Sequence, residues 1–133
     1  MRALVEKGLW PHLAEVVQFE SYLQARRARL ARQRQDDEVA ASGAMVLSRQ
    51  LAQLLVDRYG ATRVLLLGSL ARGEFGRGSD IDLAVEGVPP EVFFAAGAEL
   101  EREARGVAVD LVPLESASAF FRAEVARDGV VLA

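Results

Sequence analysis

The feature that most constrains this chain is a short apolar run that ends abruptly at a glycine–serine pair. Residues 63–67 are rich in β-forming side chains and stop at Gly68, which can turn the chain tightly without a Cβ penalty. Ser69 then stands at the expected start of a short helical turn, where free backbone N–H groups and the helix dipole attract anions. We therefore expect a strand, a turn and an anion-binding position at Gly68 and Ser69.

Two aspartates, Asp80 and Asp82, follow this pair after a gap of ten residues. Acidic and apolar side chains alternate in residues 80–85, so a strand there places both carboxylates on one face and its apolar side chains on the other. Neighbouring like charges repel unless a cation lies between them. Carboxylate oxygens favour Mg²⁺, which takes one or two protein carboxylates together with substrate phosphates. The pair therefore predicts a magnesium site.

A third acid, Asp110, interrupts the apolar strand pattern of residues 106–112. If that strand lies beside residues 80–85, Asp110 joins Asp80 and Asp82 at one edge of the sheet. Three carboxylates suit a two-metal phosphoryl-transfer site, whose metals lie about 4 Å apart. In such a site Asp110 is a metal ligand and candidate base, and Asp80 and Asp82 hold the metal that bridges to a triphosphate.

Each of these signals has an ordinary explanation when it stands alone. A glycine–serine pair is a common turn, an Asp-x-Asp pair is often a solvated strand end, and Asp110 could be exposed on an edge strand. Their combination at this spacing favours a functional origin. Arg72 could bind phosphate oxygens through its forked guanidinium, or it could be an ordinary surface arginine.

Together the glycine–serine pair, the ten-residue gap, the Asp-x-Asp pair and the later strand aspartate resemble the nucleotidyltransferase fold of the DNA polymerase β superfamily. The likeness is greatest to its minimal nucleotidyltransferases and covers roughly residues 42–133. It implies an α/β fold with a small mixed sheet flanked by helices. The site residues that it implies are Asp80, Asp82 and Asp110 for catalysis and metal binding, and Gly68, Ser69 and Arg72 for nucleotide binding.

The resemblance also implies a Mg²⁺-dependent transferase, with two metal ions, that uses ATP or another nucleoside triphosphate. In this family the domain is commonly the antitoxin encoded beside a helical HEPN toxin, and some members transfer AMP to a toxin tyrosine, a reaction called AMPylation. A HEPN-type partner is therefore expected. Two alternatives stay open: a non-catalytic antitoxin that acts by binding, and a nucleotidyltransferase for a small acceptor such as an aminoglycoside, a class that usually carries an extra helical domain.

Composition narrows the class of protein further. The 133 residues suit one domain with an added helix, and 51% of them are hydrophobic, which is enough for a core. The net charge of −3 argues against a broad nucleic-acid interface. The sequence has no cysteine, which excludes disulfides and thiolate zinc sites. We see no secretory signal and expect no membrane-spanning stretch, so a cytoplasmic location is the prediction.

The chain is expected to follow the order α, α, β, β, α, β, α. An amphipathic helical extension, residues 1–41, should precede the nucleotidyltransferase domain, residues 42–133. Ser42 and Gly43 are expected to break or re-cap the first helix. Later helices are expected from about residue 45 to 59, from Pro90 to about Arg105, and, capped by Ser116, to about Asp128.

The extension carries five arginines within residues 26–34, followed by the acidic residues 36–38, which offset them. A solvated helix face is the favoured interpretation. The alternatives are docking of a partner and a homo-oligomer formed through this helix, since an amphipathic segment must cover its apolar stripe. His12, the single histidine, is expected to be structural or exposed.

Overall fold

The computed structural model describes residues 12–133, which fall into two compact units, one ending at Asp36 and the other comprising Asp37–Ala133. Each unit is described by itself. In chain order the elements are α2 (Leu13–Tyr59), β1 (Arg63–Leu67), α3 (Gly68–Ala71), β2 (Ile81–Glu86), α4 (Pro90–Glu103), β3 (Val109–Pro113), the 3₁₀ turn η1 (Leu114–Ser116), α5 (Ala119–Asp128) and β4 (Val130–Val131).

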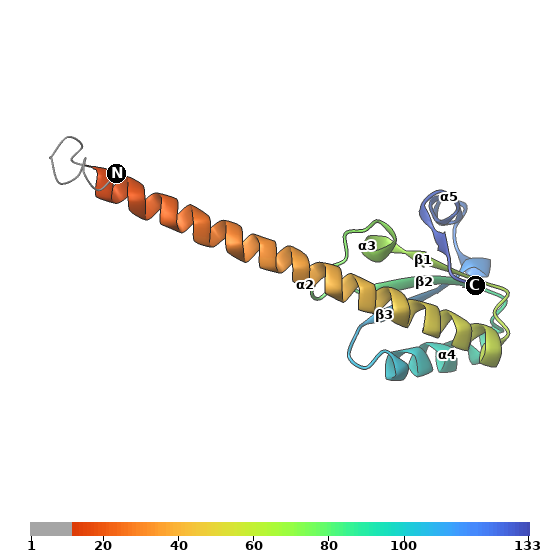
Figure 1. The fold of residues 1–133 in the computed structure, drawn as a ribbon. Helices are drawn as coiled ribbons and strands as arrows, with labels where there is room; N and C mark the ends of the chain where they lie inside the picture. Colours follow the sequence, from red (N-terminus) through yellow and green to blue (C-terminus); the bar gives the residue numbers. More distant parts are fainter. Residues whose placement is uncertain (1–11) are drawn as a thin grey trace. The chain divides into compact units, whose positions relative to one another are not determined.

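The second unit is built on a four-stranded mixed sheet in the order β3-β2-β1-β4 (Figure 1). Strand β1 runs antiparallel to β2 and β4, and β2 runs parallel to β3. Parallel neighbours need a crossover connection, and α4 supplies it. The predicted α/β fold, with a small mixed sheet flanked by helices, is confirmed.

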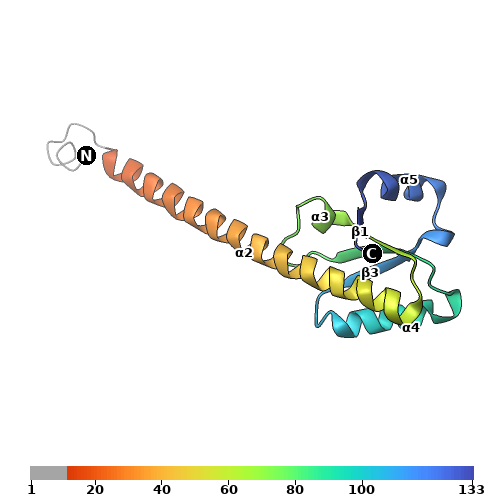
Figure 2. The same cartoon turned by 45° about the vertical axis from the view of Figure 1, so that its right-hand side comes forward.

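The two faces of the sheet are covered by hydrophobic clusters of different size. One face packs against α2 and α4 to form the main core, whose fully buried members include Leu51, Leu55, Val64, Leu66, Ile81, Leu83 and Leu100. A smaller cluster covers the other face, with Leu65 and Ala84 from the sheet packed against Leu114 and Val125. Accordingly, α4 and α5 lie on opposite sides of the sheet in both views (Figure 1 and Figure 2). Burial of each leucine contributes about 1.5–3 kcal/mol.

The predicted helix break at Ser42 and Gly43 is wrong, because α2 continues through both residues. A glycine inside a helix costs about 1 kcal/mol relative to alanine. The residues that follow, such as Ala44 and Leu51, are buried in the core, and this packing outweighs the local cost. Ser48 is also buried, and its hydroxyl donates to the Ala44 carbonyl at 2.7 Å.

Two other details differ from the sequence expectations. The cap of α5 is Ser118, whose hydroxyl accepts a hydrogen bond from the Phe121 N–H at 3.1 Å, whereas the predicted cap Ser116 lies in η1. Strand β4, which pairs with Leu65 and Leu66, was not expected. Two residues are too few to show a strand period.

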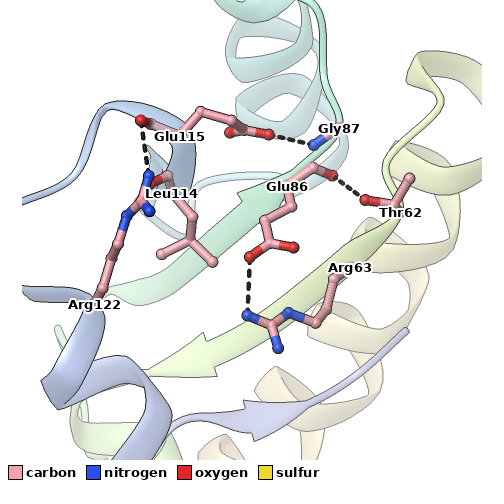
Figure 3. Close-up of polar contacts among 7 residues, drawn as sticks. All are labelled: Thr62, Arg63, Glu86, Gly87, Leu114, Glu115 and Arg122. Atoms are coloured by element: carbon pink, nitrogen blue, oxygen red, sulfur yellow. Dashed lines mark hydrogen bonds and ion pairs between the residues drawn. The ribbon is translucent and has the colours of Figure 1, made fainter. Parts of the chain in front are cut away.

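Polar contacts fix the end of the sheet where β2 finishes (Figure 3). Arg63 Nη2 pairs with Glu86 Oε1 at 2.9 Å, and the Gly87 N–H donates to Glu115 Oε1 at 2.6 Å. From α5, Arg122 Nε donates to the Leu114 carbonyl at 2.8 Å, and its Nη2 donates to the Glu115 carbonyl at 2.8 Å. These bonds anchor α5 to the 3₁₀ turn and so hold it over one face of the sheet.

By length and composition alone, one helix of the described residues, α2, could cross a membrane. The expectation that the chain has no such stretch is therefore wrong by this measure. The evidence for a membrane span is weak, because the core helix of a globular domain passes the same test. Leu51, Ala52 and Leu55 of this helix are buried in the protein core.

In the first unit, the arginines between residues 26 and 34 are all exposed, as predicted for a solvated helix face. His12 is also exposed, and its Nδ1 lies 3.6 Å from Glu15 Oε2.

The side chains of Arg58 and Tyr59, at the end of α2, both donate hydrogen bonds to Glu99 on α4. The bond from Tyr59 is the main cause that lowers the pKa of Glu99, and the same bond raises the pKa of Tyr59. A lowered carboxyl pKa stabilises the fold above the ordinary value of 4.5, and this contribution is lost as the pH falls through the lowered value.

Tyr59→Phe should lower the melting temperature at pH 7, because it removes the hydrogen bond to the Glu99 carboxylate. The difference from the unmodified protein should shrink as the pH falls below 4.5, where Glu99 becomes protonated in the unfolded chain and then in the folded one. Thermal melts followed by circular dichroism between pH 3 and 7 measure this. Tyr22→Phe, at an exposed position, is the matched control. A pH-independent difference would contradict the prediction.

Candidate active site

Gly68 brings the turn after β1 against the aspartate of the neighbouring strand. Its φ angle is +72°, in the left-handed region that favours glycine. A Cβ atom built there would overlap Asp82 Oδ2, closer than real Cβ atoms come. Two independent constraints therefore require glycine at this position: the backbone conformation and the space taken by the Asp82 carboxylate.

Asp82 and Asp110 lie side by side at the edge of the sheet where β2 and β3 begin. They are register partners on these parallel strands, and Leu67 is the register partner of Asp82 on β1. Asp82 is half-buried and Asp110 is exposed. The expected neighbourhood of the two strands is thus observed, and it brings these two predicted site residues together.

A cavity of about 310 Å³ opens at this edge. Among its lining residues are Gly68 and Arg72 from the turn, Asp82 and Asp110 from the strands, and Phe121, Glu124 and Asp128 from α5. The two acids of α5, Glu124 and Asp128, were not predicted from the sequence as site residues. A signal was present, because positions 121, 124, 125 and 128 follow the spacing of one helix face, and two of them are apolar.

Asp80 occupies a different place from its two predicted partners. It is exposed, precedes β2 and lines a second cavity of about 470 Å³ with residues of α2, such as Leu47, and of the 106–108 turn. The negative charge of Asp80 still acts on Asp82, because it is one of the causes that raise the pKa of Asp82. Ser69 is half-buried in α3 and is not among the residues that line the first cavity.

The electrostatics of the site centre on Asp82. Burial is the largest cause that raises its pKa, followed by the charges of Asp110 and Asp80, while Arg72 lowers it. Arg72 also pairs with Glu74 at 3.1 Å, and both side chains are well exposed. The half-buried carboxylate is therefore held among like charges with one cation near it, and a bound cation would relieve this repulsion.

The carboxylate oxygens at this edge of the sheet supply part of the ligand shell that a magnesium ion needs. No group of three or more His, Cys, Asp or Glu side chains among residues 12–133 is placed to hold a metal. Mg²⁺ usually takes only one or two carboxylates and completes its shell with water and substrate phosphates. The oxygen donors of Asp82 and Asp110 fit that requirement as a pair. Asp80 as a third ligand, and a second metal ion, stay predictions.

A mixed sheet with two carboxylates at the start of β2 and β3, facing a glycine turn at the end of β1, defines the nucleotidyltransferase class of fold. The sequence profile of the nucleotidyltransferase domain matches residues 48–132, and the chain belongs to this family. It is a nucleotidyltransferase, as the sequence predicted. No curated protein sequence matches the chain.

Solved structures extend the comparison. A protein assigned as a minimal nucleotidyltransferase is 32% identical, with a TM-score of 0.56 over 66% of this chain and 92% of that chain. A toxin–antitoxin complex crystallised with AMP-PNP is 28% identical, with a TM-score of 0.56 over 64% of this chain and 72% of that one. A third is the MNT antitoxin bound to the tri-AMPylated HEPN toxin of Shewanella oneidensis, at 26% identity and a TM-score of 0.51 over 67% and 71%. The predicted resemblance to minimal nucleotidyltransferases of toxin–antitoxin pairs is confirmed.

Gly68→Ala should abolish nucleotidyl transfer, because its methyl group displaces the Asp82 carboxylate. It should also destabilise the fold by about 1 kcal/mol through its left-handed backbone. Gly73→Ala is the matched control: its φ is +75° and its Cβ would meet open space. The control should lose similar stability and keep its activity. Equal loss of activity in both variants would contradict the role assigned to the Gly68–Asp82 contact.

Asp82→Asn should abolish transfer and leave the melting temperature at pH 7 unchanged or higher. Burial and two like charges raise the pKa of Asp82, so its ionised form opposes folding at neutral pH. The stabilisation should disappear below the ordinary pKa of 3.8, where the carboxyl group is protonated in both states. Paired melting curves and transfer assays measure the two effects. A strongly destabilised variant at pH 7 would show that the carboxylate has a structural role instead.

Proposed function

We propose that the chain is a Mg²⁺-dependent nucleotidyltransferase that moves AMP from ATP onto a hydroxyl group of a partner protein. The observation that carries this proposal is the pair Asp82 and Asp110, adjacent in register and facing the same cavity as Arg72. The partner is a HEPN-type toxin, and the chain is the antitoxin of the pair. Relatives crystallised with AMP-PNP and with an AMPylated HEPN toxin support the donor and the acceptor class.

The nucleotide is held mainly through its phosphates. Arg72 lines the cavity, and its forked guanidinium matches phosphate oxygens. Arg72 would have to break its ion pair with Glu74 to bind phosphate. This costs little free energy, because the pair is exposed to solvent and exposed ion pairs are weak. Ser69, at the start of α3, is the second predicted contact, with its hydroxyl as hydrogen-bond donor. These residues orient the triphosphate against the two carboxylates.

Asp82 and Asp110 are the residues that would hold Mg²⁺, with Asp80 as the predicted third ligand. When bound, the metal supplies charge neutralisation on the phosphates and makes a hydroxyl easier to deprotonate. Of the two paired carboxylates Asp110 is the exposed one, so an acceptor can reach it from solvent. The half-buried Asp82 is the more firmly positioned ligand, since Gly68 packs against it.

In the proposed reaction the acceptor hydroxyl oxygen attacks the α-phosphorus of ATP. A new oxygen–phosphorus bond forms while the bond from the α-phosphorus to the bridging oxygen breaks, and pyrophosphate leaves. The hydroxyl proton passes to a carboxylate oxygen of Asp110, the candidate base. The protein contributes mainly positioning and charge neutralisation, as is usual in phosphoryl transfer.

A direct test uses the purified chain, α-labelled ATP, Mg²⁺ and the product of the neighbouring gene, if that product is a helical HEPN protein. Label should appear on the HEPN protein, and excess EDTA should stop the transfer. Asp82→Asn and Asp110→Asn should each lower the rate at least about 100-fold, since each removes a metal ligand. Circular dichroism of both variants controls for folding.

The alternatives from the sequence give different results in this experiment. If an Asp80→Asn/Asp82→Asn double variant neutralises the toxin fully and the unmodified chain transfers no label, the protein acts by binding alone. If label passes to an aminoglycoside without any protein partner, the acceptor is a small molecule. Either outcome overturns the proposal.

The cytoplasmic location also stays a prediction, which fractionation of cells expressing the protein can test.

A further inference from the structure

Glu124 is an acid of the 310 Å³ cavity that the proposed reaction does not use. It is half-buried on the face of α5 that also carries Phe121 and Val125, and all three side chains line the cavity together with Asp82 and Arg72. Negative charge is unfavourable toward the C-terminal end of a helix, because the helix dipole is negative there. A half-buried carboxylate in the second half of α5 therefore needs a partner that stabilises it.

The rest of the described chain does not supply this partner. Among residues 12–133, no ion pair includes Glu124. Arg127, one helical turn further on, pairs with Asp128 at 3.1 Å instead. The hydrogen bond to Asp128 is the main cause that raises the pKa of Arg127, whereas the charge of Glu124 is the smallest of the causes. The carboxylate of Glu124 thus keeps its hydrogen-bonding capacity for a ligand in the cavity.

Two kinds of ligand do not fit the surroundings of Glu124. A phosphate group would be repelled, because Glu124 and Asp128 on this wall carry the same charge as phosphate oxygens. A metal ion shared with Asp82 and Asp110 does not fit either, since no three acidic side chains within residues 12–133 are placed to hold one. An ionised carboxylate only accepts hydrogen bonds, so its ligand must be a donor such as a hydroxyl or an amino group.

We propose that Glu124 accepts hydrogen bonds from the 2′ and 3′ hydroxyl groups of the nucleotide and so selects ribonucleotides over deoxynucleotides. This inference rests on the proposed function, which sets the α-phosphorus against Asp82 and Asp110. Only one oxygen and one carbon atom join that phosphorus to the ribose ring. The ribose must therefore lie beside these carboxylates, where α5 forms a wall of the cavity. An acidic residue binds a ribose hydroxyl in a similar way in dinucleotide-binding folds.

The base of the nucleotide suits Glu124 less well than the ribose does. The amino group of adenine is flanked by ring nitrogens that accept hydrogen bonds, and these would face the carboxylate oxygens. Two neighbouring hydroxyls, in contrast, offer one donor to each oxygen of a single carboxylate. Val112, Phe121 and Val125 line the same cavity, and their apolar side chains keep water away from these hydrogen bonds and strengthen them.

Isothermal titration calorimetry of the full chain with Mg²⁺ and either ATP or 2′,3′-dideoxyATP tests this inference without any transfer step. The unmodified chain should bind ATP about 10- to 100-fold more tightly, since hydrogen bonds to a charged group are strong. In Glu124→Ala the ratio of the two affinities should fall to about one. The ratio is the proper measure, because loss of the negative charge also eases binding of the triphosphate.

Glu101→Ala is the matched control, because Glu101 is exposed on α4, which lies on the opposite side of the sheet from α5 (Figure 2). It should keep the full preference for ATP. Glu124→Gln should keep part of the preference, since its amide oxygen still accepts a hydrogen bond. Thermal melts of the three variants control for folding.

Equal binding of both nucleotides by the unmodified chain would overturn the inference, and so would a preference for ATP that survives in Glu124→Ala. A variant that instead alters the choice between ATP and GTP would show that Glu124 contacts the base, which also overturns it. In each case the proposed function stands if label still passes from ATP to the partner protein. Absence of transfer, with the ribose preference present and lost in Glu124→Ala, would overturn the proposed function alone. No binding of ATP would overturn both.

Discussion

The close approach of the Asp82 carboxylate to Gly68 and Asp110 is the constraint on which the rest of the site depends. Burial and two neighbouring like charges raise the pKa of Asp82, so the arrangement opposes folding at neutral pH. It persists because β1, β2 and β3 are held in register by the core on the other face of the sheet. The fold thus maintains a charge cluster whose repulsion a metal-bound triphosphate would relieve.

The two faces of the sheet have different roles: one forms the main hydrophobic core, and the other carries the candidate site. The face toward α2 and α4 is fully apolar and supplies most of the burial. The face toward α5 is less apolar, with a small cluster around Leu65 and Val125 and the cavity beside it. Arg122 fixes α5 to the 3₁₀ turn, which holds Glu124 and Asp128 at the cavity. The face toward α5 can hold a cluster of charges, because the main core on the opposite face supplies most of the stability of the fold.

Local signals were enough to predict three of the four strands, β1, β2 and β3, and the turn after β1. The apolar run that ends at Gly68 and the alternation around Asp82 depend only on a residue and its nearest neighbours, and both were observed. The break at Gly43 was predicted from local propensity and failed, because core packing of α2 outweighs about 1 kcal/mol. Strand β4 exists only because β1 offers it an edge, which no local pattern shows.

The sequence by itself determined the chemistry of this protein: a glycine that must turn, paired carboxylates on an alternating strand, and the family to which they belong. Those features are local, since backbone conformation and side-chain alternation follow from neighbouring residues. Only the tertiary structure decided which acids meet. It set Asp110 beside Asp82 through the crossover of α4, left Asp80 at a second cavity and brought Glu124 into the first. Contacts between distant segments depend on how helices pack on a sheet, and no short stretch of sequence encodes that.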